Sequence, residues 1–584
     1  MNPFSKYPFQ VILILPSLLL ACTIISSNAP ALSPSPIGPD MSESSPMLPT
    51  VSTDILPTQT SLPPTMTTVE YPWWNKIVFY EIFVRSFYDS DGDGVGDLNG
   101  IIEKLDYLND GDASTSADLG IQGIWLMPVY PSPSYHGYDV TDFKDINPDY
   151  GTLDEFKLLL DEAHSRGIQV ILDLPLNHTS VDHPWFRESL DPQSPYRNYY
   201  IWSDVDPAYP GPFGQDVWHD GTNGAYYYGL FWSGMPDLNY TNPAVINEME
   251  ATIKYWIDMG VDGFRLDGAR HIVEEGGRQT DTLSNHRFFK DLRLFVKAIN
   301  PETLLLGEAW VGSYISSEYT KAGDELDMVF DFDLAEAFLS SASGGYAPTA
   351  LKALDFTREL FEGGKSAPFL TNHDMDRAMS AVDGDVEKAK SAATMLLTAP
   401  GVPFVYYGEE IGMSGIRGSS NNDINRRLPM QWTDKEHAGF TRGSPWALVD
   451  STYPSINVET EITNSGSLFS IYRDLVNLRN QHRVLRNGET QIIESNNYAV
   501  YAVLRSDDQE QLLVLLNLSD QPVAEYDLHI ASGSLNGVYD LEPILGKGEF
   551  TPLAANPQGG LDRYTPLLEL PAHSRFILQL IPQE

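Results

Sequence analysis

Apolar runs that alternate with amphipathic stretches dominate this chain from about residue 71 to residue 486. Eight runs are short and almost continuously apolar, as strands buried on both faces are; KIVFYEIFVRSF is the first and VPFVYYGEE the last. The stretches between them, such as LDEFKLLLDEAHSRG, have helical spacing and end at a glycine that can stop a helix. Because the polar residues of interest lie at strand ends, this alternation predicts an α/β fold with a parallel (β/α)8 (TIM) barrel rather than a doubly wound sheet.

Two regions depart from this alternation. About sixty residues after the third strand, 179–241, are rich in Tyr, Trp, Pro, Gly and Asp and have no helical period. We expect an inserted subdomain there, above the carboxyl ends of the strands. Residues 487–584 contain short alternating strands such as YAVYAVLRS, which predict a C-terminal antiparallel β-sandwich. The barrel itself would comprise residues 71–178 and 242–486.

The N-terminus carries an export pattern. After Lys6, an apolar run from Val11 to Leu20 ends in Leu-Leu-Ala-Cys22, and the run is too short for a transmembrane helix. Leu-Leu-Ala-Cys resembles a bacterial lipobox, in which the cysteine becomes the lipid-bearing first residue. We predict a lipoprotein signal peptide over residues 1–22 with lipidation at Cys22, an ordinary signal peptide being the alternative. Cys22 is the only cysteine, so no structural disulfide is expected.

Residues 23–70 are rich in Pro, Ser and Thr and poor in aromatic residues. Such a segment cannot bury enough apolar surface to offset its chain entropy, so we expect a disordered tether. The protein would then be exported and lipid-anchored to the outside of the bacterial cell membrane, or secreted.

The charge balance narrows the class of partner. There are 80 acidic and 37 basic residues, a formal net charge of -43. Such a surface repels nucleic acid and anionic lipid head groups, and it suits a neutral substrate and bound cations. We interpret most of the charges as a solvated surface. A monomer that meets the membrane only through its lipid anchor is expected.

Three acidic residues follow three separate strands. They are Asp267 in GVDGFRLDGARH, Glu308 in TLLLGEAW and Asp374 in APFLTNHD. The carboxyl ends of parallel barrel strands meet at one face, so the three groups should converge on one pocket. Converging carboxyl groups are what breaks a glycosidic bond, which predicts a carbohydrate enzyme. Taken alone, each of these three carboxyl groups could instead be solvated at the end of its strand or belong to a structural ion pair.

Four segments carry a family resemblance. DLPLNH, GFRLDGARH, GEAW and FLTNHD resemble, in order and strand placement, the four sequence regions of the α-amylase family, glycoside hydrolase family 13. The resemblance covers about residues 73–584. It implies a retaining mechanism with Asp267 as nucleophile, Glu308 as general acid/base and Asp374 as the carboxylate that stabilises the transition state. Arg265, two residues before Asp267 on the same strand, would keep that aspartate charged.

The same resemblance implies a subsite that grips one glucose ring. His178 and His373 match histidines that hydrogen-bond sugar hydroxyls around the cleaved bond. Tyr138, in YHGYDVTDF, matches a tyrosine whose ring forms a stacking floor for the sugar.

Two further predictions concern sugar contacts. Asp423 and Arg427, in NDINRRLPMQW, resemble an Asp/Arg pair that fixes terminal hydroxyls, with Arg426 as the alternative to Arg427. Aromatic residues in the insertion are either surface grips for distant sugar units or buried; they are Trp202, Trp218 and Trp232.

A cation site is indicated by DSDGDGVGDLNG, residues 89–100, after the first strand. Its carboxylates alternate with glycines that let the chain curl, so that hard oxygen ligands converge as Ca²⁺ requires. The loop departs from an EF-hand at Gly100, where that motif has a bidentate glutamate. It resembles the calcium loop of oligo-1,6-glucosidases and related family members. A further calcium site that involves Asn177, in addition to this loop, would resemble the one in many α-amylases. The predicted ligands are Asp89, Asp91, Asp93, Asp97 and the carbonyl of Val95.

Specificity depends on smaller signals. MPDLN, residues 235–239, resembles the fifth sequence region of the family. Its form is intermediate between QPDLN of oligo-1,6-glucosidases and MPKLN of neopullulanases. This form resembles that of the intermediate subfamily that includes bacterial lipoprotein α-amylases. Exo-acting oligo-1,6-glucosidases carry an aspartate three residues before the Tyr138 position, where this chain has Tyr135 followed by His136. Gly268 adds no bulk beside the nucleophile.

These features predict an endo-acting α-amylase that cleaves internal α-1,4 bonds of starch, glycogen and maltooligosaccharides. The alternatives are an exo-acting α-glucosidase or oligo-1,6-glucosidase, a maltogenic or transglycosylating relative, and a non-catalytic glucan-binding surface protein.

Overall fold

The computed structural model describes residues 71–583 except 113–114, 116 and 419–422. The predicted signal peptide with Cys22 and the predicted tether, residues 23–70, therefore lie outside the described residues. Within the described part of the chain, no helix combines the length and the apolar character that crossing a bilayer requires.

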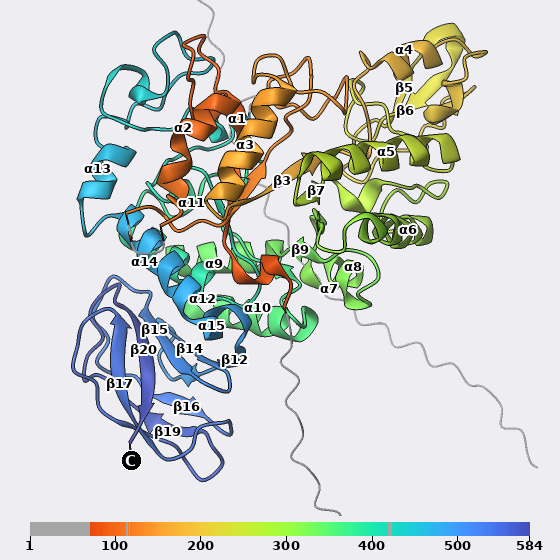
Figure 1. The fold of residues 1–584 in the computed structure, drawn as a ribbon. Helices are drawn as coiled ribbons and strands as arrows, with labels where there is room; N and C mark the ends of the chain where they lie inside the picture. Colours follow the sequence, from red (N-terminus) through yellow and green to blue (C-terminus); the bar gives the residue numbers. More distant parts are fainter. Residues whose placement is uncertain (1–70, 113–114, 116, 419–422, 584) are drawn as a thin grey trace, which may run out of the picture. The chain divides into compact units, whose positions relative to one another are not determined.

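Eight parallel strands form the central sheet, in the order β10–β9–β8–β7–β3–β2–β1–β11. Of these, β3, β7 and β9 are labelled in Figure 1. A parallel bridge between Phe369 and Phe404, and the Val402 N–H that donates to the Ser366 carbonyl, join its two ends. The sheet is thus a nearly closed barrel, and the predicted fold is confirmed. The strands are β1 (Phe79–Ile82), β2 (Gly123–Leu126), β3 (Gln169–Leu174), β7 (Gly263–Leu266), β8 (Leu304–Gly307), β9 (Met328–Phe330), β10 (Ser366–Ala367) and β11 (Phe404–Tyr406).

Local signals explain where the helices between these strands begin and end. Thr152 and Glu155 form a capping box at the start of α3. Asn242 caps α5, and Gly260 ends it in the left-handed conformation, as the glycine pattern predicts. The longer helices are α2 (Leu98–Leu108), α3 (Leu153–Ser165), α5 (Pro243–Met259), α6 (Leu283–Ile299), α9 (Phe332–Gly344), α10 (Ala347–Leu360), α12 (Val386–Thr398) and α14 (Leu468–Gln481). Shorter ones are α1 (Val84–Phe87), α7 (Ser313–Ser316), α8 (Glu318–Lys321), α11 (Ala378–Ala381), α13 (Val458–Thr463) and α15 (Arg483–Asn487).

The barrel interior changes from apolar to charged along the strands. Phe79 stacks on Phe404 with ring centroids 4.6 Å apart, within a buried cluster of interior side chains. Glu81 follows Phe79 by two residues on β1 and so lies on the same face of the strand. Asp173 on β3 and Arg265 on β7 are fully buried near the carboxyl ends of their strands. A polar layer therefore lies directly beneath the loops that follow the strands.

The long insertion after β3 forms its own small sheet. Its three antiparallel strands have the order β4–β6–β5, and Figure 1 shows β5 and β6 beside α4. The insertion also contains this short helix, which the sequence pattern does not reveal because six residues are too few to show a helical period. The elements are α4 (Pro184–Ser189), β4 (Trp202–Ser203), β5 (Trp218–Asp220) and β6 (Tyr226–Tyr228).

The C-terminal region consists of two antiparallel sheets, ordered β12–β14–β15–β20–β17–β18 and β13–β16–β19. Buried side chains of both sheets, such as Leu513 and Leu528, form one apolar cluster, as in a sandwich. The exact domain boundaries stay predictions. The strands are β12 (Glu489–Ile492), β13 (Glu494–Ser495), β14 (Val500–Ser506), β15 (Gln511–Asn517), β16 (Leu528–Ile530), β17 (Val538–Leu545), β18 (Leu553–Ala554), β19 (Leu561–Tyr564) and β20 (Arg575–Pro582).

Candidate active site

A cavity of about 1090 Å³ lies where the barrel strands end. The three carboxylates that the sequence predicts to converge all line it. Two other predicted residues, Arg265 and His373, are fully buried and lie behind the lining. The predicted residues that line the cavity are Asp267, Glu308, Asp374, Tyr138, His178, Asp423 and Arg427.

One buried guanidinium organises the carboxylates. Nη1 of Arg265 bonds to Asp267 Oδ1 and lies 2.9 Å from Asp173 Oδ1, while Nη2 lies 2.9 Å from Glu308 Oε2. Arg265 is fully buried on β7, so its charge is not screened by water. The guanidinium therefore fixes the positions of Asp267 and Glu308 with respect to each other.

The surroundings of Glu308 shift its carboxyl group toward the protonated form. Glu308 follows β8, is 8% exposed, and accepts a hydrogen bond from the Gly268 N–H at 3.0 Å. Burial raises its pKa; the Arg265 charge lowers it, but Asp267 and Asp374 raise it further, and the net direction is upward. Glu308 thus resembles a buried acid more than a free carboxylate.

The surroundings of Asp374 favour its ionised form instead. Its Oδ1 lies 2.7 Å from Arg427 Nη2 and its Oδ2 3.2 Å from His373 Nε2. Burial alone would raise the pKa of Asp374, but the charges of His373, Arg427 and Arg265 hold it well below its usual range. One cavity therefore presents a carboxyl group that favours protonation and another that stays ionised.

Tyr138 and the two histidines form the layer next to the carboxylates. The Tyr138 hydroxyl donates to Asp173 Oδ2 at 2.9 Å and lies 2.7 Å from His373 Nε2; the two rings stack with centroids 5.5 Å apart. His178 lines the cavity, and burial lowers its pKa to about 4, so its ring is neutral. His373 lies behind Tyr138 and contacts that residue and Asp374 rather than the cavity.

The structure does not join Asp423 to Arg427. Asp423 Oδ1 lies 3.1 Å from Arg426 Nη1 and 3.2 Å from Arg417 Nε, whereas Arg427 pairs with Asp374. Arg426 and Arg427 are neighbours at the end of a 3₁₀ turn, where successive side chains point in different directions. The alternative partner, Arg426, is thus the one that contacts Asp423.

Comparison with known proteins agrees with this geometry. Residues 81–488 match the family model described as "Alpha amylase, catalytic domain". The chain belongs to the α-amylase family. It is a glycoside hydrolase of family 13, and its relatives differ in their named activities.

Three relatives illustrate the range. Alpha-amylase 3 of Dictyoglomus thermophilum is 40% identical over 455 residues, which cover 77% of this chain and 86% of that protein. Oligo-1,6-glucosidase of Parageobacillus thermoglucosidasius is 36% identical over 534 residues, covering 79% and 93%. The crystal structure of the α-amylase from H. orenii has a TM-score of 0.75 and 42% identity, and covers 87% of this chain and 99% of that one.

The cavity of this glycoside hydrolase is also lined by residues that no sequence pattern singles out. Trp310, 50% exposed, stacks on Phe332 with centroids 4.7 Å apart. Trp232 lines the cavity, whereas Trp202 and Trp218 are half-buried within the insertion and do not line it. A useful signal would have been an aromatic residue shortly after a strand-end carboxylate. The other missed lining residues are Phe213, Phe231, Arg270, His271 and Arg417.

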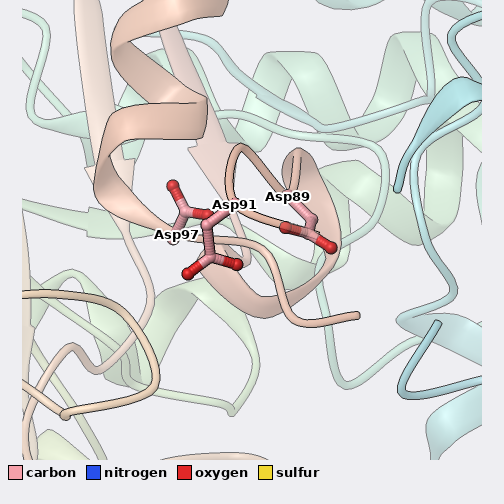
Figure 2. Close-up of side chains that lie close together, drawn as sticks. All are labelled: Asp89, Asp91 and Asp97. Carbon is pink, nitrogen blue, oxygen red and sulfur yellow. The ribbon is translucent and has the colours of Figure 1, made fainter. Parts of the chain in front are cut away.

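The acidic loop after β1 brings three carboxylates together. One oxygen from each of Asp89, Asp91 and Asp97 lies within 4.8 Å of the others (Figure 2). Calcium binds oxygen at 2.3–2.6 Å, so ligands on opposite sides of one ion are roughly 5 Å apart. Backbone amides hold the loop, since Asp89 accepts from Gly94 N–H at 2.8 Å and Asp97 from Gly100 N–H at 2.7 Å. These three residues fit a calcium ion.

Two predicted ligands do not share that arrangement. Asp93 lies outside the group of three, and its Oδ1 accepts from the Val95 N–H at 2.8 Å. That the Val95 carbonyl is a calcium ligand stays a prediction. At the second candidate position, Asn177 donates to Asp237 Oδ2 at 3.2 Å and to the His271 carbonyl at 2.6 Å.

Proposed function

We propose that this glycoside hydrolase is an endo-acting α-amylase that cleaves internal α-1,4-glucosidic bonds of starch, glycogen and maltooligosaccharides with retention of configuration. The observation that carries the proposal is the shared guanidinium of Arg265, which contacts Asp267 and Glu308 on one side of a single cavity. Retaining enzymes hold their two carboxyl groups roughly 5 to 5.5 Å apart, a separation that one bridging guanidinium suits.

Each carboxyl group would have one role. Asp267 attacks the anomeric carbon and forms a carbon–oxygen bond to it while the glycosidic bond breaks; Glu308 gives its proton to the departing oxygen. Water then attacks the same carbon, Glu308 takes a proton from that water, and Asp267 is released. Asp374, ionised between His373 and Arg427, stabilises the positive charge that develops on the sugar ring.

Endo action is supported by the walls of the cavity. Tyr135 stands where exo-acting members carry an aspartate; its ring stacks on Trp446 with centroids 5.5 Å apart. Exposed aromatic side chains also border the cavity, and Phe213, Trp232 and Trp310 are each at least half exposed. Flat apolar rings pack against sugar faces, so such a border suits a chain that continues past the cleaved bond.

A maltoheptaoside with a blocked non-reducing end tests endo action. We expect the enzyme to cut it at internal bonds and to release products of several lengths. Resistance of the blocked substrate, together with glucose release from the unblocked one, would contradict the endo proposal and leave the hydrolase assignment intact.

An exo-acting oligo-1,6-glucosidase is the second candidate. It is favoured by the 36% identical relative with that name and by Asp423, which Arg417 and Arg426 hold at the cavity edge, where a terminal ring could be bound. Isomaltotriose distinguishes the two, because an exo-1,6 enzyme should hydrolyse it faster than maltotriose and an endo-1,4 enzyme should not.

We propose that the acidic loop binds Ca²⁺. The proposal is supported by the three convergent carboxylates of Asp89, Asp91 and Asp97 and by hard oxygen chemistry. A bound cation would offset their mutual repulsion and hold the segment between β1 and α2. Isothermal titration with Ca²⁺, compared with Mg²⁺, tests this, since a site built for calcium should prefer it.

We also propose export as a monomer that is lipid-anchored at Cys22. Support comes from the Leu-Leu-Ala-Cys22 pattern and the Pro/Ser/Thr-rich residues that follow. Metabolic labelling with a radioactive fatty acid should mark the wild type and not Cys22→Ala. Labelling of both would contradict lipidation at this cysteine. Light scattering of the protein without residues 1–22 tests the monomer.

A further inference from the structure

A buried glutamate lies beneath the site, on the first barrel strand. Glu81 on β1 is 2% exposed, and its Oε1 lies 2.6 Å from Nδ1 of His373. His373 is fully buried and directly precedes Asp374. Carboxyl groups are seldom buried without a charged or hydrogen-bonded partner, because desolvation penalises them. His373 is the partner that offsets the desolvation of Glu81.

The hydrogen bonds around His373 determine how many protons its ring carries. The Tyr138 hydroxyl donates to Asp173 Oδ2, and that carboxylate is an acceptor because Arg265 Nη1 donates to it. A hydroxyl has one proton, so the Tyr138 oxygen must accept from His373 Nε2, 2.7 Å away. Nδ1 lies 2.6 Å from Glu81 Oε1 and donates to it when Glu81 is ionised. A histidine that donates from both nitrogens is an imidazolium.

The surrounding charges agree with that protonation state. Burial lowers the pKa of His373, but the charges of Asp374 and Glu81 outweigh it and raise the pKa to about 10. Burial raises the pKa of Glu81, and the His373 charge partly offsets that rise. Several charged and titratable groups surround the Glu81–His373 pair. They are His136 and Tyr138 from the segment after β2, Asp173 from β3, Arg265 from β7, Asp374, which follows His373 in the chain, and Arg427 from the segment after β11.

We propose that Glu81 is a positioning residue of the hydrolytic site, which keeps His373 doubly protonated so that Nε2 holds Tyr138 and Asp374 in place. Nε2 lies 2.7 Å from the Tyr138 hydroxyl and 3.2 Å from Asp374 Oδ2. Glu81 acts on the substrate through these groups. The inference rests on the proposed function only in taking this cavity as the place where the glycosidic bond breaks.

Substitution of Glu81 tests the effect on catalysis. Glu81→Gln keeps the shape and an acceptor but removes the charge. We expect kcat on maltoheptaose at neutral pH to fall about ten- to a hundredfold, with KM changed less, because the lost charge-assisted contacts act on Asp374. Glu81→Asp restores the charge and should recover part of kcat.

A matched control separates this role from a general effect of a buried pair. Glu325 is 5% exposed and lies 2.9 Å from His286 Nδ1, a similar pair that does not line the cavity. Glu325→Gln should leave kcat unchanged. Equal loss in Glu325→Gln and Glu81→Gln, or no loss in Glu81→Gln, would overturn the proposal.

Nitrogen-15 NMR of the histidine rings tests the proposal without activity. Signals absent from His373→Gln assign this ring. We expect it to stay doubly protonated from about pH 6 to about pH 9 in the wild type, and to lose a proton about one pH unit lower or more in Glu81→Gln. A neutral ring at neutral pH in the wild type would overturn the proposal even if Glu81→Gln failed to fold. A protonated ring in an enzyme inactive on glucans would instead refute the proposed function.

Discussion

Two carboxylate clusters in this molecule are held by different means. At the barrel mouth, Asp267 and Glu308 contact the buried guanidinium of Arg265. In the acidic loop, residues 89–97, the carboxylate oxygens accept hydrogen bonds from backbone amides and hydroxyls. An arginine built into the chain fixes its partners in all solutions, whereas amides leave most of the negative charge to be balanced by an ion. The first arrangement suits catalysis and the second suits a structural cation.

The largest difference should appear when the same substitution is made in each cluster. Asp267→Asn removes the nucleophile, and we expect kcat on maltoheptaose to fall about 10⁴-fold or more. Asp91→Asn is the matched control in the loop and should keep kcat within about twofold when calcium is present. Thermal unfolding of both variants shows that they are folded. Activity that survives in Asp267→Asn would mean that another group attacks the sugar.

The second prediction concerns the proton on Glu308. The pKa of Glu308 is raised by burial, so its protonated form persists above the usual range and kcat/KM should fall only as pH rises through that raised value. Glu308→Gln cannot give a proton, and we expect kcat to fall about 10²- to 10⁴-fold with loss of this alkaline limb.

A substrate that needs no proton sharpens that result. Maltosyl fluoride loses fluoride without acid help, so Glu308→Gln should cleave it with a much smaller loss than maltoheptaose. An equal loss on both substrates would show that Glu308 is not the acid.

Calcium should affect the loop and not the catalytic cluster. At free Ca²⁺ one hundred times Kd, binding to the folded state alone stabilises by about 2.7 kcal/mol. A chelator should therefore lower Tm in the wild type, and Asp91→Asn should show a smaller calcium-dependent shift. At a temperature well below Tm, kcat should be little changed. Loss of kcat without loss of Tm on chelation would place the cation at the catalytic cluster instead.

The smallest expected effect is at the aromatic border of the cavity. Trp310→Ala removes a half-exposed ring that stacks on Phe332, and such contacts contribute about 0.5–1.5 kcal/mol. We expect KM for maltoheptaose to rise about two- to tenfold, with maltotriose affected less. Exposed Leu283 on α6 gives the control, since Leu283→Ala should leave both substrates unchanged.

The barrel and its strand-end carboxylates could be predicted from the sequence because strand periodicity and parallel pairing dictate them. Contacts set by single loop residues could not. The alternation of Asp89, Asp91 and Asp93 does not show that Asp93 bonds to its own loop, and the run Arg426-Arg427 does not show which guanidinium faces Asp423.

The contact between Glu81 and His373 could not be predicted from the sequence either. The strand of Glu81 was predicted, and a charged residue two positions after Phe79 marks the interior face of that strand. The partner, His373, is 292 residues away in the chain, so no local pattern joins them.

In the proposed mechanism, Asp267 and Glu308 act on the same anomeric carbon while both contact the guanidinium of Arg265. Mass spectrometry of the enzyme after reaction with a slow 2-fluoro or 5-fluoro glycosyl fluoride tests it most directly. We expect one sugar attached through an ester to the peptide that contains Asp267, formed by the wild type and absent from Asp267→Asn. A sugar on another carboxylate, or turnover with inversion and no covalent adduct, would contradict it.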